Sequence, residues 1–244
     1  MDSDIDRNGL AVITGAAHRL GRFIALKLSQ MGYAVGIHYF SSDIEAQNVR
    51  EEIGAMGRPA FIFQANLTDE DDIRRMFTEI NETKYTLKVL VNSAALMIKG
   101  GLDSLDTTSW DLMMNLNLRA PWLCSKYAAK IMSEGSLILN ISDTGAGRMW
   151  TGYPAYVISK EGLEVLTRLM ALTFAPQIRV NAIAPGLILP AEGMDRQQWE
   201  KLVKKLPVKK QGSPQDITNA IEFLLNNDYI TGQTLVVDGG YQLV

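Results

Sequence analysis

Short apolar runs alternate with longer amphipathic segments from one end of the chain to the other. The short runs are apolar at consecutive positions, a pattern typical of strands that are covered on both faces of a sheet. Strands that alternate with helices favour parallel pairing with right-handed crossovers, because each helix returns the chain to the same end of the sheet. The alternation therefore predicts an α/β fold with three layers.

The expected elements fit a single Rossmann-type, doubly wound domain over residues 1–244, with about seven parallel strands and helices on both faces. Strands are expected at Leu10–Thr14, Ala34–Tyr39, Ala60–Gln64, Val89–Val91, Ser136–Ile141, Arg179–Ile183 and Thr234–Val237, and helices near 20–31, 43–56, 69–83, 107–133, 154–175 and 214–226. Pro121 should kink or divide the fourth helix. Residues 1–8 read as a polar tail, and 187–212 as a substrate loop with a short helix near 195–205.

Composition excludes several classes of function. The formal net charge of −3 provides no basic field for a nucleic-acid backbone, so no nucleic-acid partner is expected. No apolar run approaches the ~20 residues of a membrane-spanning helix. His18, His38 and the single Cys124 do not make a metal site. One cysteine also excludes an internal disulfide, and with the acidic N-terminus it favours a cytoplasmic protein.

A glycine-containing loop follows the first expected strand directly and opens into a helix: Thr14-Gly15-Ala16-Ala17-His18-Arg19-Leu20-Gly21. Gly15 permits a tight turn, and Gly21 lets the helix pack closely on the sheet. The helix N-terminus then directs free N–H groups at a pyrophosphate. We expect this loop, with His18, Arg19 and Leu20, to bind a dinucleotide, and Arg19 to contact phosphate or substrate.

The end of the second expected strand favours NADP over NAD. An acidic residue there would bond the adenosine ribose of NAD and repel a 2′-phosphate. The sequence has Ile37-His38-Tyr39-Phe40-Ser41-Ser42 instead. His38 and the hydroxyls of Ser41 and Ser42 can donate to a phosphate, so these residues and Tyr39 are expected at the cofactor.

Tyr156 and Lys160 are four residues apart in an expected helix and therefore share a face. The charge of Lys160 should favour the phenolate, although bringing the tyrosine pKa from about 10 to near neutrality takes roughly 3 units, or about 4 kcal/mol. Asp143 lies thirteen residues upstream of Tyr156. Because an ionised Asp143 would oppose phenolate formation, either Arg19 and Lys160 offset it or Asp143 carries a proton in the working state.

Several short segments occur in an order and spacing that together are highly specific. They are Thr14-Gly15…Gly21, Asn92-Ser93-Ala94-Ala95, Asn117, Asn140-Ile141-Ser142-Asp143, Tyr156-x-x-x-Lys160, Pro185-Gly186 and Thr231-Gly232-Gln233…Asp238-Gly239-Gly240. Over nearly its whole length the chain resembles the short-chain dehydrogenase/reductase family.

The resemblance assigns roles. It implies that Tyr156 is the general acid, that Lys160 binds the nicotinamide ribose, and that Asn117 holds a water in the proton relay. It further implies that the cofactor is surrounded by Asn66, Leu67, Asn92, Ala94, Pro185 and Gly186, in addition to the glycine loop. Such proteins are commonly homotetramers that pair the helices near 107–133 and 154–175 and the C-terminal strand region. The apolar side chains Leu163, Leu166, Leu169 and Met170 could serve that contact or the monomer core.

Asp143 departs from the family pattern, which has a serine at this position to bond the substrate carbonyl. Arg19, the His38-Tyr39 pair and Asp143 are together similar to the pteridine reductase subgroup. A pterin is reduced at C=N bonds, so a carboxyl beside Tyr156 could pass protons or hold the aminopyrimidine edge. The subgroup's usual serine and aromatic residue are replaced by Ala95 and Met97, which we also expect at the substrate.

These observations leave three hypotheses. The first is an NADPH-dependent reductase that transfers hydride to a small planar substrate such as a pterin. The second is a carbonyl reductase that acts on 3-oxoacyl compounds or similar ketones. The third is an NADP-binding sensor or scaffold with little turnover. In each enzymatic case the resemblance implies that residues 187–205, including Met194 and Trp199, close over the substrate.

Overall fold

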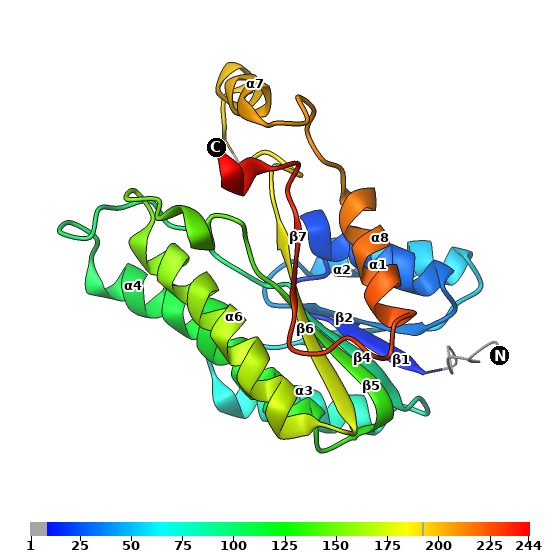
Figure 1. The fold of residues 1–244 in the computed structure, drawn as a ribbon. Coiled ribbons are helices and arrows are strands. Elements are labelled where there is room, and N and C mark those ends of the chain that lie inside the picture. Colours follow the sequence, from blue (N-terminus) through cyan, green and yellow to red (C-terminus); the bar gives the residue numbers. More distant parts are fainter. Residues whose placement is uncertain (1–8, 192) are drawn as a thin grey trace.

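The computed structural model describes residues 9–191 and 193–244, so the polar tail expected over 1–8 lies outside it. Seven parallel strands form one sheet in the order β3-β2-β1-β4-β5-β6-β7 (Figure 1). The strands are β1 Leu10–Ile13, β2 Ala34–Tyr39, β3 Ala60–Gln64, β4 Leu87–Asn92, β5 Met132–Ile141, β6 Ile178–Pro185 and β7 Thr234–Val237. The expected seven-stranded Rossmann-type sheet is confirmed.

Helices cover both faces of the sheet (Figure 1). One face carries α1 Arg19–Gln30, α2 Asp43–Ala55 and α8 Pro214–Leu225, and the other carries α3 Glu70–Asn81, α5 Ala120–Ala128 and α6 Pro154–Phe174. The remaining helical elements are α4 Thr107–Met114, the π-helical turn η1 Asn115–Arg119, the 3₁₀ turns η2 Ala146–Arg148 and η3 Tyr241–Leu243, and α7 Arg196–Lys205.

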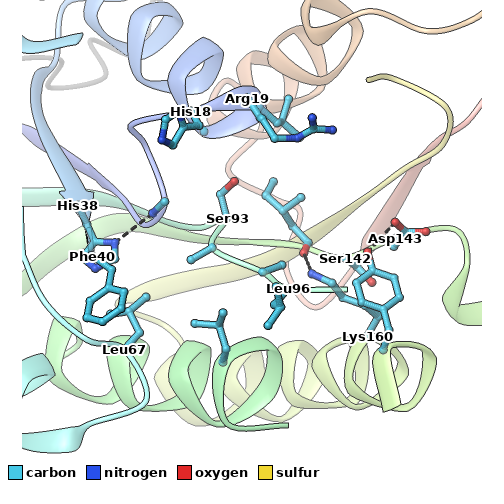
Figure 2. A pocket seen from close by; sticks show the side chains of 18 of the residues that line it. His18, Arg19, His38, Phe40, Leu67, Ser93, Leu96, Ser142, Asp143 and Lys160 are labelled. Carbon is cyan, nitrogen blue, oxygen red and sulfur yellow. Dashed lines mark hydrogen bonds between the residues drawn. The ribbon is translucent and has the colours of Figure 1, made fainter. Parts of the chain in front are cut away.

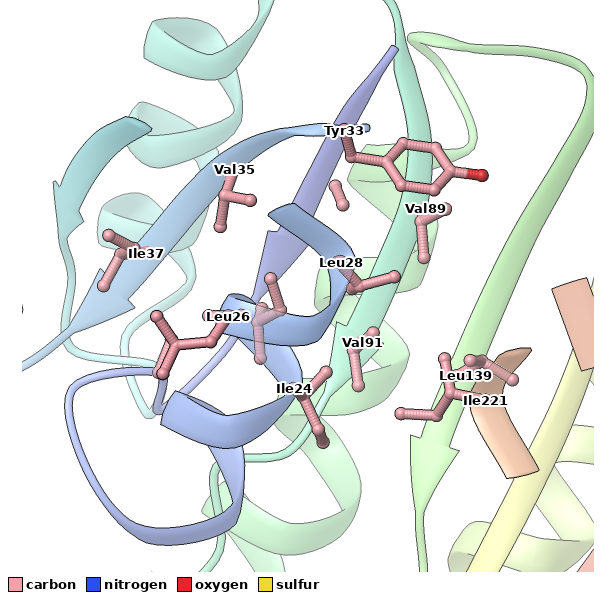
Figure 3. Packing of buried hydrophobic residues seen from close by; sticks show 14 of the residues in the cluster. Ile24, Leu26, Leu28, Tyr33, Val35, Ile37, Val89, Val91, Leu139 and Ile221 are labelled. Carbon is pink, nitrogen blue, oxygen red and sulfur yellow. The ribbon is translucent and has the colours of Figure 1, made fainter. Parts of the chain in front are cut away.

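The core lies between the sheet and its helices. Figure 3 shows Ile24 and Leu28 of α1 beside Val91 of β4, with Ile221 reaching in from α8. These four side chains have no exposed surface. Burying an aliphatic side chain of this size stabilises a fold by about 1.5–3 kcal/mol, so the apolar pattern of the sequence accounts for the layering.

The single helix expected over 107–133 extends too far at its C-terminal end, because the helical residues stop at Ala128. The chain passes from α4 through η1 into α5, which ends at Ala128, and β5 begins at Met132. Pro121 stands at the start of α5 and has no N–H, so the carbonyl of Asn117 lacks its regular α-helical donor. The turn widens there, and the Ala120 N–H bonds the carbonyl of Asn115, five residues back. The expected division at Pro121 therefore takes the form of a π-turn.

The strand order indicates at which edge of the sheet a ligand would bind. β1 pairs with both β2 and β4, so the crossovers run in opposite directions from this point. In such sheets ligands bind beyond the carboxyl ends of the strands at the reversal. The loop between β6 and α8 reaches over the same edge and contains α7, close to the helix expected at 195–205. Its two ends meet where the Gly212 N–H donates to the Leu187 carbonyl at 3.0 Å.

Candidate active site

A cavity of about 700 Å³ opens at the carboxyl ends of the strands (Figure 2). The predicted site residues that line it are Gly15, His18, Arg19, Leu20, Gly21, His38, Asn66, Leu67, Ala94, Ala95, Asp143, Tyr156, Lys160, Pro185 and Gly186. Those outside the lining are Tyr39, Ser41, Ser42, Asn92, Met97 and Asn117. Figure 2 shows His38, Phe40 and Leu67 at one end of the cavity and Asp143 and Lys160 at the other.

The β1–α1 loop has the close packing that a phosphate loop requires. Gly15 has φ +66°, a conformation that favours glycine. A Cβ on Gly21 would lie 2.2 Å from the carbonyl oxygen of Gly15, so only glycine lets α1 begin beneath the turn. Thr14 joins the loop to the end of β4, because its hydroxyl accepts from the N–H groups of Ser93 at 2.9 Å and Ala94 at 3.1 Å.

Arg19 connects the β1–α1 loop to the loop between β6 and α8. Its backbone is left-handed, with φ +47°, and its Nη2 donates to the carbonyl of Pro190 at 2.7 Å. The guanidinium therefore lies at the cavity rim between the two loops, with donors remaining for an anion or a substrate.

His38 does not offer the phosphate donor that the sequence suggested. The ring is 2% exposed; Nδ1 accepts from the Gly15 N–H at 3.0 Å, and Nε2 lies 3.0 Å from the carbonyl of Ala65. Both nitrogens therefore hold loops of the protein together. Tyr39 is also engaged, since its hydroxyl donates to Asp43 at 2.8 Å. Phe40 and Ser41 are exposed at this strand end, and of the two Phe40 lines the cavity.

This role of His38 predicts a stability loss in mild acid. Burial lowers the pKa of the imidazole from 6.5 to about 4, so the folded state keeps it neutral where the unfolded chain binds a proton. Its contribution is complete above pH 6.5 and is lost as the pH falls towards 4, by roughly 3 kcal/mol. Urea unfolding at a series of pH values should show a shallower acid decline in His38→Asn; parallel declines would contradict this role.

Two predicted asparagines act from behind the cavity. Asn92 donates to Ser125 at 3.2 Å and to Asn140 at 2.8 Å, which ties β4 to its neighbours. The Asn117 side chain is fully buried, accepts from the Leu96 N–H at 2.8 Å and donates to the Leu96 carbonyl at 2.8 Å. Asn117 therefore fixes the loop after β4.

Asp143 and Tyr156 meet in the cavity, at the end opposite His38 and Phe40. The Tyr156 hydroxyl donates to Asp143 Oδ2 at 2.8 Å, and the Gly145 N–H donates to Oδ1 at 2.6 Å. Burial raises the pKa of Asp143, against the effect of these two donors and of Lys160. The spacing of thirteen residues in the sequence thus becomes a direct carboxylate–phenol contact.

The expected lowering of the Tyr156 pKa is wrong for this arrangement. Burial raises the pKa of Tyr156 well above 10, and the Asp143 carboxylate raises it further. Lys160 does not bond the phenol; its Nζ donates to the Ile141 carbonyl at 2.7 Å and lies 5.8 Å from the centre of the Tyr156 ring. Burial also lowers the pKa of Lys160 to about 8. Tyr156 therefore keeps its proton and directs it at Asp143.

Ser142 cannot replace the missing serine. It lines the cavity, but its hydroxyl donates to Glu164 Oε1 of α6 at 2.8 Å. Successive side chains at a strand end point in different directions, so Asp143 alone faces Tyr156.

Other residues that line the cavity were not predicted from the sequence. The additional lining residues include Phe40, Ser93, Leu96, Leu112, Leu116, Ser142, Ile188 and Leu189. Their positions directly after expected strands were a usable signal for Phe40, Ser93 and Ser142, since ligands bind at that edge. Leu112 and Leu116 gave no such signal, because they line the cavity only once α4 and η1 are packed in place. Across residues 9–191 and 193–244, no cluster of three or more potential ligands could hold a metal ion.

Comparison with known proteins identifies the family. The family described as enoyl-(acyl carrier protein) reductase matches residues 15–242. The 3-oxoacyl-[acyl-carrier-protein] reductase FabG of Staphylococcus aureus is 34% identical over 237 residues, covering 94% of this chain and 96% of the relative. This chain belongs to the short-chain dehydrogenase/reductase family. It is accordingly an oxidoreductase.

Solved structures of this family share the fold closely. FolM alternative dihydrofolate reductase 1 of Brucella suis, in complex with NADP, is 31% identical with a TM-score of 0.93, over 98% of this chain and 96% of that one. A blue fluorescent protein from a metagenomic library, in complex with NADPH, is 30% identical with a TM-score of 0.90, over 96% and 97% of the two chains. In the described part of this short-chain dehydrogenase/reductase, no helix has the length and apolar character to cross a membrane.

Proposed function

We propose that this chain is an NADPH-dependent reductase that transfers hydride to a C=N bond of a small planar nitrogen heterocycle such as a dihydropterin. The observation that carries the proposal is the contact between Asp143 and Tyr156, 2.8 Å long and buried at the end of the cavity. A carboxyl occupies the position where the family has a serine.

The chemistry of a C=N bond suits this pair. Hydride adds to the carbon while the nitrogen takes a proton, so the site must hold a proton donor beside the acceptor atom. Burial raises the pKa of both Asp143 and Tyr156, which keeps a proton on the pair at higher pH than either group would in water. A ketone instead develops an alkoxide, and a carboxylate beside an alkoxide is electrostatically unfavourable.

The residues present also fit NADP, which would supply the hydride when bound. The loop at Gly15 and Gly21 leaves no room for side chains, as required where a backbone approaches a pyrophosphate. Lys160 would hold the nicotinamide ribose, and its charge faces Asp143 and Tyr156. Among the residues that the structure describes, no acidic side chain lines the cavity at the end of β2, where one would repel a 2′-phosphate. The NADP and NADPH complexes of the structural neighbours support this choice.

A second candidate function is reduction of 3-oxoacyl thioesters, which the similarity to FabG favours. The third, a cofactor-binding sensor, requires that the chemistry be lost. The presence of Tyr156, Lys160 and Asn117 together counts against a sensor.

The test is NADPH oxidation by the purified protein. Dihydrobiopterin, dihydrofolate and an acetoacetyl thioester are offered separately with NADPH or NADH, and nicotinamide absorbance is followed. We expect turnover with a dihydropterin compound and a preference for NADPH. Turnover of the thioester alone would support the second candidate, and tight NADPH binding without any turnover the sensor. A preference for NADH would contradict the cofactor assignment.

We further propose a homo-oligomer, with a tetramer as the expected form. Leu163 and Met170 are buried in the subunit core, whereas Val165, Leu169 and Leu172 of α6 are 46%, 56% and 80% exposed. Val165 and Leu169 line a shallow groove of about 430 Å³ between α6 and η1–α5. An exposed apolar helix face of this kind fits a second copy.

The variant Leu169→Glu should therefore dissociate the assembly, because it would bury a charge in the contact. Light scattering coupled to size-exclusion chromatography should show a smaller mass than for the unmodified protein, whereas Glu161→Gln on the same helix should leave it unchanged. A monomeric unmodified protein would contradict the proposal.

We also propose that the enzyme works in the cytoplasm and that residues 1–244 form one domain. The single cysteine, Cys124, is buried and free, which fits a reducing compartment.

A further inference from the structure

The C-terminal turn packs against the loop that carries Asp143. Tyr241, in η3, is 7% exposed, and Arg148 in η2 reaches it from the loop after β5. Arg148 Nη1 donates to the backbone carbonyl of Tyr241, and the guanidinium carbon lies 4.2 Å from the centre of the Tyr241 ring. One cation thus grips both the ring and the backbone of the last turn.

A second contact continues from Tyr241 to the carboxylate. The rings of Trp150 and Tyr241 lie 6.3 Å apart between centroids. A Cβ on Gly145 would lie 2.6 Å from the Trp150 ring and 2.8 Å from Asp143 Oδ1. The indole is therefore packed on the turn whose Gly145 N–H donates to Oδ1 at 2.6 Å. Only a residue without a side chain fits between the indole and the carboxylate.

The same C-terminal segment supports the substrate loop. The Val208 N–H donates to the Gly239 carbonyl at 3.3 Å, and a Cβ on Gly240 would lie 2.7 Å from Pro207. Figure 1 shows the C-terminal turn beside α7. The C-terminal turn is thus wedged between the 143–150 loop and the loop between β6 and α8.

We propose that Tyr241 is a positioning residue: through Arg148 and Trp150 it holds the Gly145 amide on Asp143 Oδ1, and so directs Oδ2 at Tyr156. The inference rests on the proposed role of Asp143 in the reaction. Without the Tyr241 side chain, the 143–150 loop can relax and the Asp143 carboxylate can rotate. The proton shared by Asp143 and Tyr156 is then no longer held in one position. A misplacement of this kind costs up to about 100-fold in rate.

The wedge also predicts a change in pH dependence. The titratable groups that act on Asp143 are Tyr156 and Lys160 from α6 and Tyr241 from η3, and the cation of Arg148 in η2 contacts Tyr241. The Gly145 hydrogen bond favours the ionised carboxylate. Its loss should raise the pKa of Asp143 and move the limb of the pH–rate profile that Asp143 controls to higher pH.

The experiment compares Tyr241→Ala, which removes the ring, with Tyr241→Phe, which keeps it; both variants keep the backbone carbonyl that Arg148 binds. Kinetics use whichever substrate the unmodified protein reduces, with NADPH dissociation constants and melting temperatures measured in parallel. We expect Tyr241→Ala to lower kcat about 10- to 100-fold and to shift the pH limb upward. Tyr241→Phe should stay within about twofold, and NADPH affinity should be unchanged in both.

A second variant guards against a failure to fold. Arg148→Met removes the cation that contacts Tyr241 but leaves Tyr241 unchanged. It should move the limb of the pH–rate profile that Asp143 controls to higher pH, as Tyr241→Ala does. An unchanged kcat and pH profile in Tyr241→Ala would overturn the inference. A fall in kcat that only matches a fall in NADPH affinity and in melting temperature would also overturn it. If the thioester proves to be the only substrate, the proposed function fails, yet the pH shift still decides whether Tyr241 positions Asp143.

Discussion

Replacing Tyr156 by phenylalanine should lower kcat/KM by about 10²- to 10⁴-fold, the usual loss when a general acid is removed. The phenol donates to Asp143 at 2.8 Å, and in the proposed reaction it carries the proton that reaches the substrate. The substitution removes a single oxygen from a buried ring, so NADPH affinity should remain within about twofold. Steady-state kinetics and NADPH fluorescence titration measure the two quantities.

Tyr153→Phe is the matched control, because Tyr153 stands at the start of the same helix but outside the cavity lining. Its kinetics should be close to those of the unmodified protein. Retention of more than a tenth of the activity in Tyr156→Phe would show that another group supplies the proton.

Replacing Asp143 by serine should exchange one activity for another. Dihydropterin reduction should fall by about 100-fold or more, because the variant loses a proton carrier and a carboxylate partner for the heterocycle. Reduction of an acetoacetyl thioester should rise, since a hydroxyl can donate to the developing alkoxide without repelling it. The ratio of the two kcat/KM values, measured against the unmodified protein, reports the exchange directly.

Asp143→Asn separates charge from shape. The amide keeps nearly the same volume and can still accept from Gly145, but it cannot carry a proton between groups. It should lose dihydropterin reduction without gaining much thioester reduction. Dihydropterin turnover by Asp143→Ser at the unmodified rate would remove Asp143 from the mechanism.

Much of the fold follows from local patterns. Consecutive apolar runs predicted each of the seven strands to within a few residues, because burial on both faces leaves no other pattern. The helix expected over 107–133 failed because its amphipathic pattern continues past Ala128, where the chain turns into β5. Pairing with β4 and β6, which are distant in the sequence, decides that boundary.

The site divides in the same way. The positions of Asp143, Tyr156 and Lys160 at the cavity follow from their spacing and from the strand end that carries Asp143. The direction of the Tyr156 pKa does not, because burial of the phenol raises it first and the contact with Asp143 raises it further, and the spacing reveals neither the burial nor the contact. His38 was misjudged for a similar reason: its partners, Gly15 and Ala65, lie 23 and 27 residues away, and spacing does not reveal them.

Isotope transfer shows whether the hydride of NADPH reaches the carbon of a pterin C=N bond. The protein is incubated with dihydrobiopterin and NADPH that carries two deuterium atoms at C4, and the product is examined by mass spectrometry. The proposed hydride transfer should yield tetrahydrobiopterin that contains one deuterium bound to carbon. An unlabelled and unchanged pterin, with deuterium appearing only in the 3-hydroxyacyl product of a parallel thioester reaction, would contradict it.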